Sequence, residues 1–350
     1  MKKKNVINLI KYYAEKNDIA FKDEAYEVAK DFEADGDYQL GEYIVSVLAN
    51  SNSFITQSNE RESEFLKRVD IKNEHLILPK LIKNDIDGIM NAINHKIGVN
   101  KFLFEGAPGT GKTAAAKLIA EVLEKNLFIV NFDQLIDSHL GQTQKNIAKL
   151  FEDINSFSFT NRNIVLFDEI DSIAIDRINN NDVREMGRAT SAMLKGFDSL
   201  RDDVVIIATT NLYESFDKAL IRRFDAIINF NRYSREDLIE VADAYTTSLL
   251  KKYDMIGKNS RLLRKILNLY EKIPYPADLK NLIKTSIAFS NIDNEYDYLR
   301  NLFNKVYTKE DKKDPKSLQK LGFSLREIEI LTKISKSQLA RELKEIIDEE

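Results

Sequence analysis

The sequence predicts an α/β protein built on a parallel sheet, with helical segments before and after it. Between about residues 75 and 231, short apolar runs rich in Ile, Val and Phe alternate with helical stretches, which is typical of a parallel sheet covered on both faces. Outside that region, apolar side chains recur at helical spacing. Five strands are expected, at Phe102–Phe104, Leu127–Val130, Ile164–Phe167, Val204–Ala208 and Ile227–Phe230.

The first fifty residues are expected to form a small helical bundle. Three stretches keep helical spacing, and a break at Asp35-Gly36-Asp37 separates the second from the third. Residues 15–42 carry ten acids and three bases, so the bundle has an acidic exterior. That exterior is either a solvated helical face or a docking surface for a protein partner, and both interpretations stay open. The polar residues 51–74 are expected to form a linker.

Four further segments follow. Residues 75–231 hold the expected sheet, residues 232–290 are helical again, and residues 291–314 are expected to form a second linker. Residues 315–350 have clear helix boundaries, because proline follows an N-cap at Asp314 and Ser324 has capping-box spacing to Glu327. Their short helices are separated by a turn at residues 322–324, which gives a helix-turn-helix pattern.

Composition excludes several classes of protein. The 350 residues include no cysteine and three widely spaced histidines, which excludes disulfide frameworks and thiolate metal sites and disfavours a histidine-built metal centre. The 52 basic and 56 acidic side chains leave a net charge of −4, so the chain has no broad nucleic-acid-binding surface. The longest apolar runs are about a quarter of a membrane span, and the start lacks a signal-peptide core. We expect a cytoplasmic protein without membrane association.

The segment Gly106-Ala-Pro-Gly-Thr-Gly-Lys112-Thr113 matches the phosphate-loop pattern G-x-x-x-x-G-K-[ST] at every defined position. Its glycines let backbone N–H groups point at phosphate oxygens, and the helix that follows adds the positive end of its dipole. We expect Lys112 to reach the β- and γ-phosphates of ATP and the Thr113 hydroxyl to bind Mg²⁺. The expected nucleotide-binding residues are Gly106, Ala107, Pro108, Gly109, Thr110, Gly111, Lys112, Thr113 and Ala114.

A second motif, Ile164-Val-Leu-Phe-Asp168-Glu169, places two acids at the carboxyl end of an expected buried strand. In a parallel sheet that end lies beside the phosphate loop. Asp168 is expected to hold the magnesium ion directly or through water. Glu169 is expected to polarise the attacking water, because in-line attack on the γ-phosphate needs a positioned base.

Together these motifs resemble the classic clade of AAA+ ATPases, over roughly residues 75–290. The resemblance implies a P-loop NTPase core with a five-stranded parallel sheet and helices on both faces, followed by a small helical lid over residues 232–290. The segment Ile206-Ile-Ala-Thr-Thr-Asn211 resembles the sensor-1 strand of that family. The resemblance therefore implies that Asn211 orients the attacking water.

The segment Asp217-Lys-Ala-Leu-Ile-Arg222-Arg223-Phe-Asp225 resembles the family's arginine-finger segment. The resemblance implies that Arg222 or Arg223 reaches the nucleotide of a neighbouring subunit, and hence a homo-oligomeric ring, usually a hexamer. Arginine suits this role because its permanently charged fork offsets charge that develops on the transferred phosphoryl group.

Three weaker matches follow from the resemblance. Asn131 falls where the family often has an asparagine that restrains the catalytic glutamate. The segment Tyr275-Pro276-Ala277-Asp278-Leu279 resembles the lid turn that passes close to adenine and ribose, with proline in place of glycine, and it adds Ala277 to the expected nucleotide-binding residues. His139 stands where a pore loop that grips polypeptide has an aromatic residue, so threading of a peptide stays open.

Two functions remain open. In the first, the chain is a ring ATPase that remodels or regulates a protein partner. Small bacterial ATPases with the Leu-Gly-x-Thr loop seen at residues 140–143 resemble those found beside subtilisin-like proteases in phage-defence or plasmid-exclusion modules. In the second, the chain is a DNA-associated ATPase switch that uses residues 315–350, whose seven basic and seven acidic residues give no surplus of positive charge.

Overall fold

The computed structural model describes residues 3–15, 17–50, 63–71, 76–136, 141–157, 160–174, 182–252, 257–291, 294–308 and 314–341. Contacts divide the chain into two units. One comprises Met1–Ser63 with Ser156–Phe159, and the other comprises Glu64–Asn155 with Thr160–Glu350. None of the described helices is long and apolar enough to cross a membrane.

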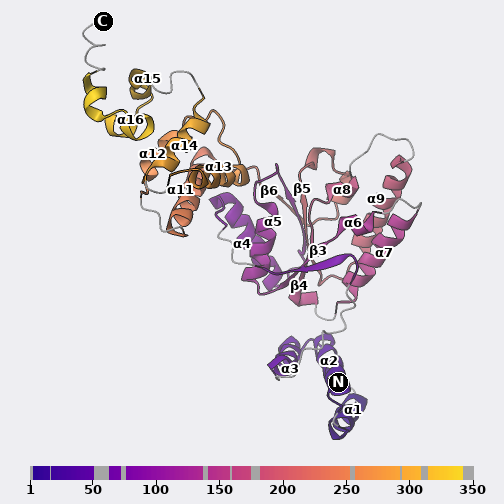
Figure 1. Cartoon of the computed structure of the whole chain (residues 1–350). Helices are drawn as coiled ribbons and strands as arrows, with labels where there is room; N and C mark the ends of the chain where they lie inside the picture. Colours follow the sequence, from indigo (N-terminus) through magenta and orange to yellow (C-terminus); the bar gives the residue numbers. More distant parts are fainter. Residues whose placement is uncertain are drawn as a thin grey trace. The chain divides into compact units, whose positions relative to one another are not determined.

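The described residues of the first unit form three helices, α1 (Lys3–Ala14), α2 (Asp18–Ala34) and α3 (Tyr38–Asn50) (Figure 1). The side chain of Asn17 caps α2 by accepting a hydrogen bond from the Ala20 N–H. Helix α2 packs against both α1 and α3. Its core is small and consists of Ala25, Val28, Ala29 and Val45. The three helices occupy the stretches that the sequence predicts.

The second unit is built on a six-stranded sheet in the order β1-β3-β4-β5-β2-β6 (Figure 1). Five strands are parallel and match the predicted runs. They are β2 (Lys101–Glu105), β3 (Asn126–Val130), β4 (Asn163–Phe167), β5 (Val205–Thr210) and β6 (Ala226–Asn229). Strands β4 and β5 are buried along their whole length because helices cover both faces of the sheet.

The sixth strand corrects the predicted count of five. Strand β1 (Leu66–Val69) pairs antiparallel with β3, with Leu66 opposite Val130. It lies inside residues 51–74, which the sequence analysis assigns to a linker. An edge strand needs no continuous apolar run, and Lys67 and Arg68 at its centre are exposed. The strand therefore lacks the signal that identifies the other five.

The sheet separates two apolar cores. Helices α4 (Lys80–Asn94) and α5 (Lys112–Val122) share one core with side chains from β2, β3, β4, β5 and β6. On the opposite face, Phe151 of α7 (Gln142–Asn155) and Phe197 of α9 (Asp182–Ser199) contact Phe167 of β4, with ring centroids 6.0 Å and 5.6 Å from that of Phe167. Figure 1 shows the two pairs of helices on opposite sides of the sheet. Short helices α6 (Phe132–Leu135), α8 (Asp171–Ala174) and α10 (Lys218–Ile221) lie between the strands in the chain.

Six of the helices that the structure describes after the sheet share one core. They are α11 (Arg235–Lys252), α12 (Ser260–Leu267), α13 (Pro276–Ala288), α14 (Asp297–Val306), α15 (Pro315–Lys320) and α16 (Leu325–Thr332). Helix α14 lies inside residues 291–314, so that segment is not a plain linker. Leu318, Ile328 and Leu339 are fully buried in the same core as Leu262 and Leu299. Residues 315–341 therefore pack into the same core as α11–α14 rather than forming a separate helix-turn-helix module.

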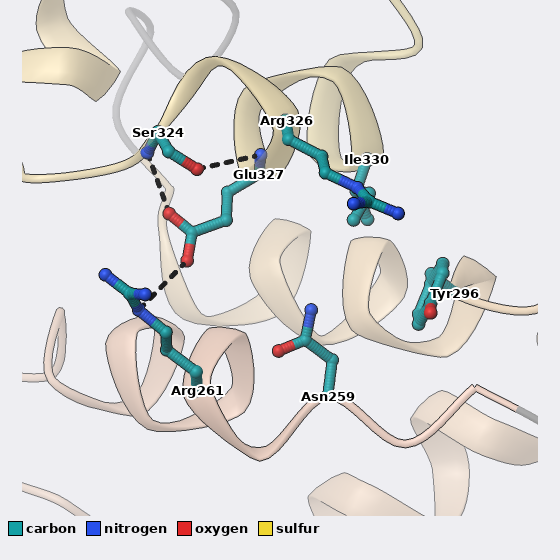
Figure 2. Close-up of a pocket in the computed structure, with 7 residues that line it drawn as sticks. All are labelled: Asn259, Arg261, Tyr296, Ser324, Arg326, Glu327 and Ile330. Atoms are coloured by element: carbon teal, nitrogen blue, oxygen red, sulfur yellow. Dashed lines mark hydrogen bonds and ion pairs between the residues drawn. The ribbon is translucent and has the colours of Figure 1, made fainter.

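Polar contacts also fix α16 onto α12 (Figure 2). Ser324 and Glu327 form the expected capping box, and Glu327 Oε2 also accepts a hydrogen bond from Lys265 Nζ at 2.7 Å. Burial raises the pKa of Glu327, but the hydrogen bonds from Lys265 and Ser324 outweigh that effect, so its pKa lies below the ordinary value. Figure 2 shows Arg261 on the other carboxylate oxygen, beside a pocket of about 220 Å³.

Candidate active site

The phosphate loop connects β2 to α5 at the carboxyl edge of the sheet. Gly106, Gly109 and Gly111 all have positive φ angles, of 146°, 78° and 100°. At Gly109 the space is also restricted, because an added Cβ would lie 3.0 Å from the Cβ of Ala277. Glycine is therefore required there by both conformation and packing.

Lys112 lies in the floor of this loop and is 6% exposed. Its Nζ donates to the carbonyl oxygens of Gly106 at 2.7 Å and Ala107 at 3.0 Å, and to Asn211 Oδ1 at 2.8 Å. Burial lowers the pKa of Lys112, and the nearby carboxylates of Asp171, Asp168 and Glu169 oppose that shift. The ammonium group is held inside the curl of the loop, where phosphate oxygens would replace carbonyl and amide oxygens.

Thr113 and Asp168 meet across the loop. The Thr113 hydroxyl donates to Asp168 Oδ1 at 2.8 Å. Mg²⁺ takes oxygen ligands and is commonly bound by one or two protein oxygens together with phosphates and water. This pair fits such an ion when it arrives with a nucleotide. Within the described residues, no group of three or more His, Asp or Glu side chains could hold a metal ion by itself.

Glu169 follows Asp168 in a left-handed backbone conformation, with φ of 55°. Its N–H donates to the Thr209 hydroxyl at 2.8 Å, and its carboxylate Oε1 lies 3.5 Å from Asn211 Nδ2. Asn211 thus lies between Lys112 and Glu169 and contacts both. An amide in that position can orient a water molecule beside the carboxylate.

Lys112, Thr113, Glu169, Thr209 and Asn211 line one pocket of about 290 Å³. Residues of the phosphate loop, Glu169 and Asn211 form one side, and Pro276, Ala277 and Lys280 of α13 contribute from the lid. The N–H of Ala277 donates to the Gly109 carbonyl at 3.0 Å, so α13 contacts the loop although proline replaces the expected glycine. Lining residues from the predicted set are Pro108, Gly109, Gly111, Lys112, Thr113, Ala114, Glu169, Asn211 and Ala277.

A tyrosine at the start of the lid holds the loop from the other side. Tyr233 donates its hydroxyl hydrogen to the Thr110 carbonyl at 2.8 Å. Burial raises the pKa of Tyr233, which keeps it protonated and able to donate. Its ring meets Tyr275 edge-on at 6.3 Å. Tyr233 and Ala277 therefore both donate hydrogen bonds to carbonyl oxygens of the phosphate loop.

The two arginines lie away from this pocket and differ from each other. Arg223 forms a bidentate ion pair with Asp198 of α9, from Nε to Oδ1 at 2.8 Å and from Nη2 to Oδ2 at 2.9 Å. The Arg223 guanidinium holds the pKa of Asp198 below its ordinary value. Arg222 is exposed, and among the described residues its side chain makes no hydrogen bond or ion pair. Neither arginine lines the pocket described above.

Three polar residues of the site are not among the residues that the sequence predicts. Thr209 and Asp171 are 1% and 7% exposed, and Tyr233 is half-buried at the loop. The signal for Thr209 was a hydroxyl at the end of an otherwise apolar strand. Among the described contacts, the Asn131 side chain makes no hydrogen bond to Glu169. His139 of the expected pore loop lies outside the described residues, while Gly141 begins the next described segment.

Sequence comparisons find known proteins that are similar to the region containing the phosphate loop and the two acids. Residues 102–232 match the family "ATPase family associated with various cellular activities (AAA)". An uncharacterized AAA family ATPase, y4kL, from Sinorhizobium fredii is 39% identical over 133 residues, which cover 38% of this chain and 39% of that protein. The peroxisomal ATPase PEX6 from Komagataella pastoris is 32% identical over 175 residues, which cover 48% of this chain and 14% of PEX6. The matched region thus spans less than half of each relative.

The likeness to a solved structure concerns the fold and not the function, because the sequence identity is low. A chain of the E. coli MS115-1 HORMA:CdnC:Trip13 complex superimposes with a TM-score of 0.56 at 17% identity, covering 69% of this chain and 95% of that one. The family match spans β2 through β6 and includes the phosphate loop and the two acids. Residues 102–232 of this chain are therefore similar to the AAA family of ATPases.

Proposed function

We propose that this protein hydrolyses ATP in a homo-oligomeric ring and uses the hydrolysis cycle to remodel or regulate a protein partner. The observation that supports hydrolysis is the convergence of Lys112, Thr113, Glu169 and Asn211 on one pocket, with Asp168 hydrogen-bonded to Thr113 beside it. Lys112 and Thr113 begin α5, and the other three residues follow β4 and β5 directly. Together they supply a cation, an oxygen pair, a base and an amide.

Each residue has a role that its contacts support. Lys112 would bind the β- and γ-phosphates, and Thr113 with Asp168 would hold Mg²⁺, which neutralises phosphate charge when bound. Glu169 would accept a proton from the attacking water, which Asn211 helps to orient. The backbone of Gly106–Thr113 would donate to the phosphates, and Ala277 would border the nucleotide from the lid.

The first experiment tests this assignment. Lys112→Ala should lose nucleotide binding because it removes the buried cation of the loop. Glu169→Gln should retain ATP binding but lower turnover by about 10²–10⁴-fold, since it keeps the shape and removes the base. Binding is measured with a fluorescent ATP analogue and turnover by phosphate release. Turnover near the wild-type rate in Glu169→Gln would exclude Glu169 as the base.

The ring proposal rests on the difference between the two arginines. Arg223 is held by Asp198 within its own subunit, whereas Arg222 extends from the same loop without a partner among the described residues. We assign the trans-acting role to Arg222 and a loop-supporting role to Arg223. The expected hexamer is part of this proposal.

A mixing experiment tests the shared site. Arg222→Ala subunits keep Lys112 and Glu169, and Glu169→Gln subunits keep Arg222. If Arg222 acts on the neighbouring subunit, a mixture of the two inactive variants should regain turnover, and the specific activity of the wild type should rise with protein concentration. Mixed oligomers that stay inactive, together with a concentration-independent wild-type rate, would rule out action in trans.

The N-terminal bundle favours a protein partner. Leu40 and Val47 lie seven residues apart on α3, and both are exposed, as are Ile7 and Ile10 on α1. Ten acids and three bases lie in residues 15–42 of the same bundle. Exposed apolar side chains among acids fit an amphipathic segment with basic side chains. We therefore assign the partner-binding surface to the bundle.

Capture of a partner on the trapped enzyme tests this assignment. Glu169→Gln loaded with ATP should co-purify one specific protein. The double substitution Leu40→Asp with Val47→Asp should abolish capture, whereas Gln39→Asp, which adds a charge at an exposed polar position of α3, should not. Equal capture by all variants would remove the bundle from partner binding. A co-purifying subtilisin-like protease would support the defence or plasmid-exclusion context.

A further inference from the structure

Thr209 of β5 joins the two acids of the site through a single hydroxyl. The side chain is 1% exposed, and its hydroxyl donates to Asp168 Oδ1 at 2.8 Å. The same oxygen accepts the N–H of Glu169 at 2.8 Å. A threonine hydroxyl has one hydrogen to donate, so its donor is fully committed to Asp168.

The Asp168 carboxylate is fixed from two directions. Its Oδ1 accepts hydrogen bonds from both Thr113 and Thr209. Thr113 belongs to the phosphate loop and is a proposed metal ligand, whereas Thr209 lies on the neighbouring strand. The orientation of Asp168 is therefore anchored by a residue that has no assigned role in holding the nucleotide.

The backbone at Glu169 also depends on Thr209. Glu169 has a positive φ of 55°, a conformation that costs free energy for a residue with a side chain. Two hydrogen bonds to Thr209 hold this bend, from the Glu169 N–H to the hydroxyl and from the Ile170 N–H to the carbonyl at 3.0 Å. The bend directs the Glu169 side chain to the pocket, where it lies near Asn211.

We propose that Thr209 is a positioning residue for ATP hydrolysis, orienting the metal-binding carboxylate of Asp168 and fixing the backbone that presents Glu169. The proposal rests on the proposed ATPase function. Thr209 acts through these two residues and does not itself take part in the chemistry. Its loss should impair the geometry of the reaction while leaving the binding of the nucleotide phosphates to Lys112 and the loop intact.

The test compares Thr209→Val, which keeps the shape and removes the hydroxyl, with Thr209→Ser, which keeps the hydroxyl. We expect the valine variant to lower kcat by about 10–100-fold, as loss of supporting hydrogen bonds around a metal site typically does. Its affinity for a fluorescent ATP analogue should stay within about threefold of wild type, and the Mg²⁺ concentration for half-maximal rate should rise. The serine variant should restore most of kcat.

Thr210→Val is the matched control. Thr210 is also fully buried and accepts the Leu212 N–H at 3.1 Å, but successive strand side chains lie on opposite faces, and among the described residues the Thr210 side chain makes no hydrogen bond to either acid. Its substitution should change kcat by less than about threefold while disturbing the strand to a similar extent. If Thr209→Val binds no nucleotide, Thr209→Ala takes its place, because it removes the hydroxyl without adding bulk.

The outcomes separate this proposal from the function on which it rests. Wild-type turnover in the hydroxyl-free variant, or an equal loss in Thr210→Val, would overturn the role of Thr209 and leave the ATPase assignment intact. A fall in nucleotide affinity as large as the fall in kcat would likewise show a merely structural role. A wild-type protein that binds ATP but does not hydrolyse it would overturn both proposals.

Discussion

Substitution of Gly196 by alanine should destabilise the second unit, because this glycine allows α9 to approach α7. An added Cβ would lie 2.1 Å and 2.2 Å from two ring carbons of Phe151. Ordinary contacts begin near 3.4 Å, so the ring or the helix must shift by more than 1 Å. Phe151 is 2% exposed and packs against Phe167 and Phe197, which leaves it little room to move.

The expected magnitude follows from two opposing effects. Overpacking a well-packed core costs about 1–3 kcal/mol, and the size of this overlap favours the upper end of that range. Alanine in place of glycine inside a helix gains about 1 kcal/mol. The net loss is therefore about 2 kcal/mol, which should lower Tm by about 4–8 °C for a unit of this size.

Thermal unfolding followed by circular dichroism measures this loss. Gly187→Ala is the control, because Gly187 lies on the same helix with nothing within 4 Å of an added Cβ, so the helix gain should raise Tm. In the background of Phe151→Leu, which shortens the clashing side chain, Gly196→Ala should cost much less. If Gly196→Ala raises Tm as Gly187→Ala does, the close packing of α7 on α9 is refuted.

Three further predictions concern other parts of the molecule. Because the pKa of Glu327 is lowered in the folded state, its contribution to stability is complete above its ordinary pKa of 4.5 and is lost as the pH falls through the lowered value. Glu327→Gln should therefore lower the free energy of unfolding by about 1.5–3 kcal/mol at neutral pH and by much less in acid. Equal losses in thermal melts at both pH values would contradict this. Arg222→Ala should lower kcat on the order of 10³-fold with nucleotide affinity nearly unchanged. Arg223→Ala and Asp198→Asn should each lower kcat by about tenfold. Steady-state kinetics that show the reverse order would reassign the trans-acting arginine. The protein should show no salt-sensitive binding to duplex DNA by gel shift, since residues 315–341 pack into the core of α11–α14 and residues 315–350 carry no net positive charge. Weaker DNA binding by Arg341→Ala than by the wild type would instead support the DNA-associated alternative.

The sequence alone predicts the five parallel strands, the phosphate loop and the two acids at the end of β4. These features are encoded within short stretches, either as uninterrupted apolar runs or as glycines at fixed spacing before Lys112. Strand β1 escapes such an analysis because an edge strand with exposed Lys67 and Arg68 carries no apolar run. The same holds for residues 315–341, whose capping signals locate helices correctly but do not say what the helices pack against.

The tertiary structure alone decides which side chains meet. Arg222 and Arg223 are identical neighbours in the sequence, and only the position of Asp198 on α9 pairs one and leaves the other exposed. Thr209 becomes part of the site because β5 lies beside β4, forty residues away from Glu169. Such pairings depend on how separate elements pack, and no local periodicity encodes them. The sequence therefore determines the chemical groups of the site, while the fold determines their orientation.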